Sequence, residues 1–187
     1  SPDSVPNNRS EIYSFPEPVR RDAPITRVYS YGVLIPSDDE FVAPDRYFSI
    51  QQIHDHPDPG DPLRWPNMII MAGAGEFQVK LPLVNPPGEH QMHRTAGVYP
   101  LVRNKWYDIE VHIHLSVENT GWVKVLIDKD LVVDERGHAT QYDDVEGPHF
   151  RLGMYNIWHH KSGANQMTGM VARAYFSNCW HYAPSGV

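Results

Sequence analysis

Residues 106–117 read WYDIEVHIHLSV, and their alternation of apolar and polar side chains decides the fold class. Successive side chains of a β-strand point to opposite faces, so a period of two predicts a half-buried antiparallel strand. We expect one face of this strand to pack on a core and the other to meet water or a cleft. The apolar face holds Tyr107, Ile109, Val111, Ile113 and Leu115, and the polar face holds Asp108, Glu110, His112, His114 and Ser116.

The same pattern of short β-type runs and turns continues on both sides of this segment. Residues 118–121 read ENTG and lead into a second apolar run, which predicts a hairpin, and residues 128–130 make another tight reversal. The 17 prolines and 13 glycines separate such runs along the chain, which is typical of an all-β sandwich or barrel. The predicted strands span 11–15, 27–35, 48–54, 67–72, 76–83, 106–117, 123–127, 131–133, 150–155 and 172–179.

Length and charge limit the classes of function. The 187 residues fit a single domain over 1–187 with a core of its own. The net charge of −7 argues against non-specific nucleic-acid binding and counts mildly against a polyanionic substrate, unless basic residues gather locally in a cleft. No apolar stretch approaches the roughly 20 residues of a membrane span.

The ends and the cysteine content add two expectations. The chain begins at Ser1 with neither a methionine nor a signal-peptide core, so we expect a processed product or an excised domain. The single cysteine, Cys179, cannot form an internal disulfide, and we expect a buried structural thiol.

Two predicted strands carry polar side chains that a shared sheet would bring together. Gln52 and His54 point to one face of the strand over 48–54. In the strand over 150–155, Arg151 and Tyr155 lie on the face opposite the apolar residues, and Gly153 between them leaves room for a ligand. An amide, an imidazole, a guanidinium and a phenol on one surface could hold a sugar carboxylate and move a proton beside it. A purely structural, hydrogen-bonded role for the histidine is the alternative.

Two further groups have both a functional and a structural interpretation. Arg9 and Glu11 share a face of the N-terminal strand, where they form either a weak surface ion pair or a clamp in which Glu11 fixes an acid-binding Arg9. Among the five tryptophans, Trp65 and Trp158 could stack on sugar rings. Ordinary core or rim packing is the alternative, and we expect it for Trp106 and Trp180.

Signals for other chemistries are weak. Eleven histidines suggest a metal, yet no HExxH, CxxC or distinctive carboxylate triad accompanies them. Asp55, Asp58 and Asp61 could hold a structural calcium ion, with a solvated acidic loop as the alternative. There is no GxSxG elbow and no Gly-rich phosphate loop, and no local pattern selects the carboxylate pair of a glycosidase.

Three short motifs resemble the ordered signatures of the jelly-roll polysaccharide lyases. They are Arg9-Ser10-Glu11, Gln52-Ile53-His54 and Leu152-Gly153-Met154-Tyr155, where the alginate lyases of that group read R-S/T-E, Q-I-H and Y-F-K-A-G-x-Y. Residues 106–108, 121–125, 131–133 and 174–178 are similar to the heparin-lyase and glucuronan-lyase branch. The resemblance runs from residue 9 to about residue 179, and it implies a β-jelly roll of two antiparallel sheets with a concave groove.

The chain departs from the alginate-lyase pattern at several positions. Phe150-Arg151 stands where that pattern has an aromatic residue, Phe and Lys, and Ile157 replaces a glutamine. The first signature lies near the N-terminus, so we expect a preceding strand of the usual fold to be short or missing. These departures bear on the substrate subsites more than on the central chemistry.

The resemblance implies cleavage of a uronic-acid polysaccharide by β-elimination. Gln52, with Arg9 and His54, would neutralise the C6 carboxylate, and Tyr155 would be the general acid toward O4. Either Tyr155 or His54 would be the base at C5. A phenol with an ordinary pKa near ~10 needs nearby cations to act as a base, and we expect Arg151 on the same strand face and Lys124 nearby to supply them. The implied substrate-binding residues are Arg9, Glu11, Arg151, Lys124, Trp65 and Trp158.

The implied partner is an anionic polysaccharide, with no cofactor or metal required, and the implied place of action is extracellular, secreted or virion-associated. A non-catalytic carbohydrate-binding or adhesion module on the same sandwich is the alternative, and a glycoside hydrolase of a related sandwich type is a third possibility. The particular uronate, endo or exo action and the oligomeric state stay open.

Overall fold

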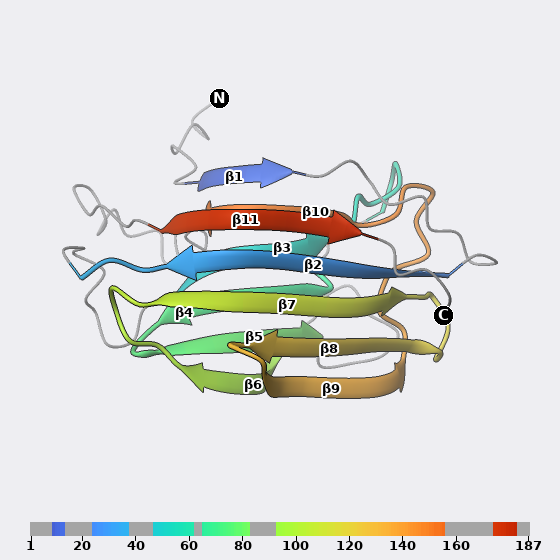
Figure 1. Cartoon of the computed structure of the whole chain (residues 1–187). Helices are drawn as coiled ribbons and strands as arrows, with labels where there is room; N and C mark the ends of the chain where they lie inside the picture. Colours follow the sequence, from blue (N-terminus) through green and yellow to red (C-terminus); the bar gives the residue numbers. More distant parts are fainter. Residues whose placement is uncertain are drawn as a thin grey trace, which may run out of the picture.

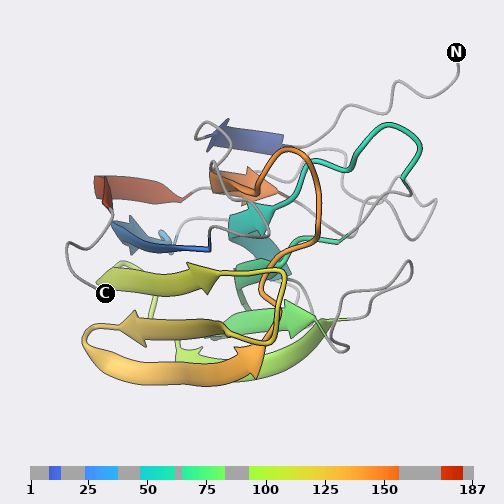
Figure 2. The same ribbon diagram turned by 90° about the vertical axis from the view of Figure 1, so that its right-hand side faces the viewer.

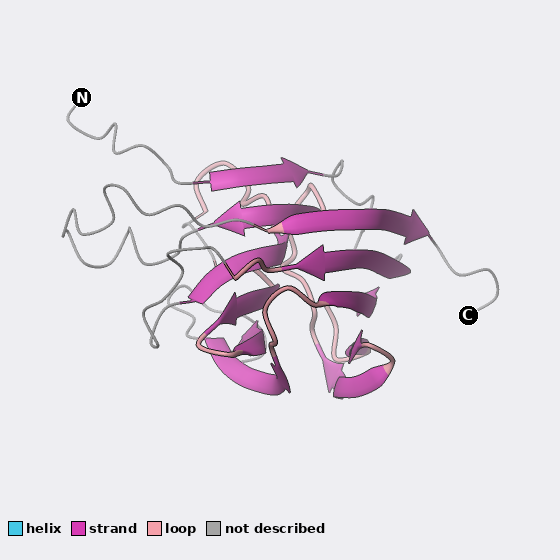
Figure 3. Ribbon diagram, turned by 60° about the vertical axis from the view of Figure 1, so that its left-hand side comes forward, coloured by secondary structure: helices cyan, strands magenta, loops and turns pink. Residues whose placement is uncertain are grey.

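The computed structural model of the protein describes residues 9–13, 24–37, 47–61, 65–82, 93–155 and 174–182. Within these ranges every element of regular secondary structure is a β-strand. The strands form two antiparallel sheets that lie face to face (Figures 1 and 2). Figure 3 shows the same strands without any helix among them. The predicted all-β sandwich is therefore confirmed. None of these ranges holds a helix long and apolar enough to cross a membrane.

The two sheets differ in the number of strands. The six-stranded sheet has the order β1-β10-β3-β4-β5-β6 and consists of β1 (Arg9–Tyr13), β10 (His149–Tyr155), β3 (Tyr47–His54), β4 (Met68–Gly73), β5 (Glu76–Pro82) and β6 (His93–Pro100). The five-stranded sheet has the order β11-β2-β7-β8-β9 and consists of β11 (Tyr175–Tyr182), β2 (Ile25–Leu34), β7 (Trp106–Leu115), β8 (Gly121–Ile127) and β9 (Asp130–His138).

The core lies between the sheets, and β7 contributes the apolar face that its alternation predicts. Ile109 and Val111 are fully buried, and Tyr107 meets Phe77 of the opposite sheet edge to face, with ring centroids 5.0 Å apart. Burying a large apolar side chain contributes about 1.5–3 kcal/mol. The alternating pattern of residues 106–115 thus acts through packing across the sandwich.

A hydrogen bond crosses this core and joins β2 of one sheet to β3 of the other. Tyr31 on β2 donates to Oε1 of Gln51 on β3 at 2.9 Å, and both side chains are buried. Burial raises the pKa of Tyr31 well above its ordinary value, so the phenol stays neutral and keeps its donor. Because Gln51 points inward, the next side chain on the strand, Gln52, points away from the core.

Strand β6 was not predicted, and its packing explains why. Its sequence, HRTAGVYP, does not alternate between apolar and polar residues. It is an edge strand that pairs with β5 alone, and its register against β5 shifts. A Cβ atom at Gly97 would lie 2.5 Å from the carbonyl oxygen of Val132 on β9. The close approach of the two sheets at this edge requires glycine, which interrupts the strand-like pattern.

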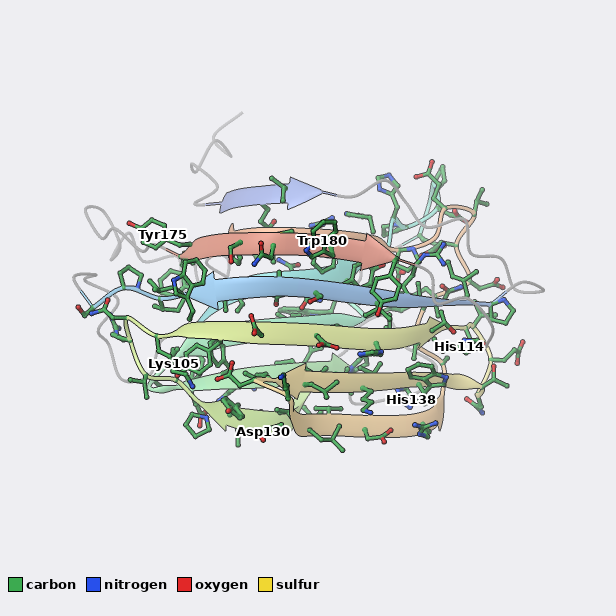
Figure 4. All side chains as sticks on the ribbon, in the orientation of Figure 1. Lys105, His114, Asp130, His138, Tyr175 and Trp180 are labelled. Atoms are coloured by element: carbon green, nitrogen blue, oxygen red, sulfur yellow. The ribbon has the colours of Figure 1, made fainter. Side chains whose placement is uncertain are left out.

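The outer face of the five-stranded sheet carries exposed aromatic side chains. Trp106, Tyr175 and Trp180 are 48%, 53% and 69% exposed, and Figure 4 shows Tyr175 and Trp180 along β11. Core packing is therefore excluded for Trp106 and Trp180. Cys179 is exposed as well, so the expectation of a buried thiol is wrong. It lies on an edge strand, within a register shift between Ser177 and Trp180.

The first prediction concerns the core. Ile109→Ala should lower the free energy of unfolding by about 2–5 kcal/mol, because it leaves a cavity between the sheets. Leu131→Ala removes an exposed side chain of the same size and should cost less than about 0.5 kcal/mol. Urea denaturation of both variants measures the difference, and equal losses would contradict the core described here.

The second prediction concerns His114 on β7. Nδ1 of His114 lies 3.0 Å from Oγ1 of Thr26, and its ring stacks on Trp122. Desolvation lowers the pKa of His114, so below about pH 6.5 the unfolded state binds more protons than the folded state. Stability should fall as the pH drops through this range. His114→Gln should make the free energy of unfolding depend less on pH, as measured by denaturation at several pH values. An unchanged pH dependence would contradict this role of His114.

Candidate functional site

The outer face of the six-stranded sheet, the face turned away from the five-stranded sheet, collects most of the predicted site. Strand β10 pairs with β3 so that Arg151 lies opposite Gln52 and His149 lies opposite His54. Directly paired residues of antiparallel strands point to the same face. Tyr155, four residues beyond Arg151, follows the same alternation. The pairing therefore brings together strands that are about a hundred residues apart in the chain.

Strand β1 completes this group along the other edge of β10. Arg9 pairs in register with Tyr155, and Glu11 pairs with Gly153. Nε2 of Gln52 donates to Oε1 of Glu11 at 2.8 Å, a contact that reaches across β10. Gln52 is 1% exposed, so this bond fixes its amide. Within the described part of the chain, the second amide hydrogen of Gln52 has no other acceptor.

A main-chain contact sets the tautomer of the His54 ring. Nδ1 of His54 lies 2.7 Å from the carbonyl oxygen of Asp55. A carbonyl oxygen only accepts, so Nδ1 carries a proton, and in a neutral ring Nε2 is the nitrogen that can accept one. The ring of His149 stacks against it with centroids 6.1 Å apart. The arrangement gives His54 a defined orientation and a basic nitrogen.

His149 belongs to this surface and was missed by the sequence interpretation. Nε of Arg151 donates to Nε2 of His149 at 2.7 Å, so His149 is the acceptor and holds the guanidinium. His149 is buried at 7% exposure. Its spacing of two residues from Arg151 placed it on the same strand face, and this spacing was the signal available in the sequence.

Asp55 supports His54 from the loop that follows β3. Its carboxylate is buried, and Nδ2 of Asn67 donates to Oδ1 of Asp55 at 3.2 Å and to the carbonyl oxygen of Thr140 at 2.8 Å. The backbone N–H of Asn67 also donates to the carbonyl oxygen of Ile53 at 2.8 Å. These bonds hold the peptide whose carbonyl orients His54.

The structure regroups the aspartates proposed for calcium. Asp58 and Asp61 gather with Asp144, with their nearest carboxylate oxygens within 4.8 Å of one another. Asp55 is bound to Asn67 instead and is not in this group. Oδ1 of Asp58 already accepts the amide of Val145 at 2.9 Å. Asp144 thus takes the place of Asp55 in the set that was considered for calcium.

A bulge in β10 aims Tyr155. The register between β10 and β3 shifts between Leu152 and Tyr155, and Gly153 within this shift has φ of 143°. Residues with a side chain rarely adopt such a value, so glycine is required here by the backbone. Tyr155 then lies opposite Ser49 on β3 and Arg9 on β1, at the end of the polar surface.

Comparison with known proteins identifies the family. A family profile described as polysaccharide lyase matches residues 1–178. The chain belongs to the polysaccharide lyase family. Its enzymatic class is thus that of a lyase, as the resemblance implied. A comparison with curated proteins finds no match.

Solved structures of other lyases share this fold. The endo-β-1,4-glucuronan lyase of the fungus Trichoderma reesei is 19% identical with a TM-score of 0.77, covering 98% of this chain and 78% of its own. An alginate lyase of Pseudomonas aeruginosa is 16% identical with a TM-score of 0.60, covering 97% and 77%. The marine alginate lyase of Aplysia kurodai is 12% identical with a TM-score of 0.61, covering 91% and 74%. At these identities the likeness concerns the fold.

Other predicted site residues of the lyase lie elsewhere. Lys124 on β8 pairs with His112 on β7 and points to the outer face of the five-stranded sheet. The whole sandwich separates it from Tyr155, so the expectation that it lies near the phenol is wrong. The turn before β8 predicted that β8 pairs with β7. It did not show that this pair belongs to the sheet opposite the one that holds Tyr155.

The two predicted sugar-stacking tryptophans have different outcomes. Trp65 is half-buried just before β4, and its ring meets His93 of β6 edge to face, with centroids 5.6 Å apart. It thus packs beside the far edge strand of the sheet, and its predicted contact with sugar stays a prediction. Trp158 lies outside the described residues.

A second polar group on the outer face was missed as well. Tyr47 donates to Oε1 of Glu76 at 2.7 Å, and Gln78 donates to the same carboxylate oxygen. Burial and the Glu76 bond raise the pKa of Tyr47 to about 12, whereas the two bonds lower the pKa of Glu76. Lys80 follows on the same face of β5, where its alternation with the buried Val79 and Leu81 was the available signal.

The third prediction tests the bulge. Gly153→Ala should lower the free energy of unfolding by about 1–3 kcal/mol, because alanine is strained at this φ, and should also lower kcat by displacing Tyr155. Gly137→Ala is the control: its φ is 79° and a Cβ there meets nothing within 4 Å. That variant should change stability by about 1 kcal/mol and leave kcat unchanged. Unaltered turnover by the Gly153 variant would contradict the role of the bulge.

Proposed function

We propose that this lyase cleaves a uronic-acid-containing polysaccharide by β-elimination, with Gln52, His54 and Tyr155 as its central residues. The observation that carries the proposal is the pairing of β10 with β3 and β1, which gathers these side chains on one face. The family match supports the reaction class, and the contacts described above support the assignment of roles.

The first requirement of the reaction is a more acidic C5 proton. Removing it places negative charge on the C6 carboxylate, and donors held toward that group stabilise the charge as it develops. Gln52 has a fixed amide with one hydrogen still to donate, since Glu11 accepts the other. Arg9, opposite Tyr155 in the register, is the proposed cation for the same carboxylate.

The proton transfers divide between two residues. We assign the base to His54, because Nδ1 is held by the carbonyl oxygen of Asp55 and Nε2 is the basic nitrogen. Nε2 takes the proton from C5, and the electrons of that C–H bond form the C4–C5 double bond as the C4–O4 bond breaks. Tyr155 donates its phenolic proton to O4 as the general acid. Both residues regain their starting state by exchange with water.

The substrate class follows from two further considerations. The structurally similar enzymes described above are a glucuronan lyase and alginate lyases, whose substrates are polyuronates. The outer face also presents two cations, Arg151 on β10 and Lys80 on β5, on a chain whose net charge is −7. Both considerations support an anionic polymer over a neutral one. The mechanism uses no metal.

The fourth prediction tests this mechanism. Incubation with glucuronan, alginate, heparinoids and capsular polysaccharides should release an unsaturated uronate on at least one of them, detected by ultraviolet absorbance. Tyr155→Phe and His54→Gln should each lower kcat by about 10²–10⁴ while substrate is still retained. Tyr175→Phe, an exposed tyrosine of the other sheet, is the matched control and should turn over like the parent.

Three outcomes would contradict the proposal. Retention of glycans without product by the parent would indicate a carbohydrate-binding module. Release of reducing ends without the unsaturated chromophore would indicate a glycoside hydrolase. Full activity of the Tyr155→Phe and His54→Gln variants would remove these residues from the chemistry.

A further inference from the structure

Lys80 shares a row of the six-stranded sheet with Gln52. The register runs from Gln52 on β3 to Ile69 on β4 and then to Lys80 on β5, so all three point to the outer face. Two strand spacings of about 4.8 Å separate the backbones of Gln52 and Lys80 by roughly 10 Å. Thr95 on β6 ends the row. Gln52 and Ile69 are buried and Lys80 is half-buried, and Lys80 is the next polar side chain along the row from Gln52.

The surroundings of Lys80 leave its charge without a carboxylate partner. Nζ of Lys80 donates to Oγ1 of Thr95 at 2.6 Å, which uses one of the three ammonium hydrogens. Lys80 makes no ion pair within the part of the chain that the structure describes, and Glu76, on the same strand, is bound by Tyr47 and Gln78. Two donors of the ammonium are thus left for a ligand.

Partial burial makes this arrangement unfavourable in the absence of an anion. Desolvation lowers the pKa of Lys80, and the charge of Glu76 opposes this only in part. Two other cations among the described residues are paired with carboxylates: Lys105 contacts Asp128, and Arg94 contacts Glu135. A half-buried ammonium without such a partner is stabilised by a negatively charged ligand.

We propose that Lys80 binds a second carboxylate of the polysaccharide, on the sugar two residues from the one held at Gln52. This inference rests on the proposed function. In an extended 1,4-linked chain, successive sugars are turned by roughly half a revolution, so alternate carboxylates project to the same side. The roughly 10 Å between the Gln52 and Lys80 backbones is comparable to two sugars. The polymer would then cross β3, β4 and β5 instead of running along a strand.

Matched lysine variants and substrates of defined length test this. Lys80→Gln should raise KM about tenfold for hexameric or longer oligoglucuronate or oligoalginate, and change kcat less than about twofold, since a charged hydrogen bond remote from the reacting bond is lost. For oligomers too short to reach from Gln52 to Lys80, KM should be unchanged. Lys80→Arg should restore most of the affinity, which also shows that the fold is intact.

Lys124→Gln provides the control for overall charge. Lys124 is also half-buried, but it lies on the other sheet, so its substitution should leave KM unchanged. Equal effects of the two glutamine variants, or an effect of Lys80→Gln that does not depend on oligomer length, would overturn the inference and indicate general electrostatic attraction.

A binding measurement separates this inference from the proposed reaction. If the parent forms no unsaturated product, retention of the same hexamers on immobilised protein replaces KM. Weaker retention by Lys80→Gln and normal retention by Lys124→Gln would support the carboxylate site even though the lyase mechanism had failed. Unchanged retention by Lys80→Gln, or no retention by the parent, would overturn it.

Discussion

The pairing of β10 between β1 and β3 is the constraint on which the proposed site depends. It places Arg151 opposite Gln52, His149 opposite His54, and Tyr155 opposite Arg9. The bulge at Gly153 adjusts the end of the strand without changing which face Tyr155 occupies. Behind this surface, the Tyr31–Gln51 bond ties β3 to the other sheet, so the site is built on a strand anchored in the core.

Local pattern was sufficient for much of this arrangement. The alternation of residues 106–115 and the β-turn signals predicted the sandwich, and the strand parity of Gln52, His54, Arg151 and Tyr155 predicted their common face once a shared sheet was assumed. These features depend on neighbours in the sequence, which is why they can be deduced without a structure.

Features set by distant strands could not be predicted in the same way. Strand β6 lost its pattern because Gly97 must let Val132 approach, and Lys124 was assigned to the wrong surface because its sheet is decided by its pairing with β7. His149 and Lys80 carried the right parity but had no motif to single them out. In each case the sequence did not show which strand is the neighbour in the sheet.

The most direct test of the account is a crystal structure of the Tyr155→Phe variant with a bound oligouronate. The account predicts a C6 carboxylate hydrogen-bonded to the amide of Gln52, with Nε2 of His54 about 3–3.5 Å from C5 of the same sugar. An oligosaccharide bound elsewhere, for example along the exposed aromatic residues of β11, would contradict it.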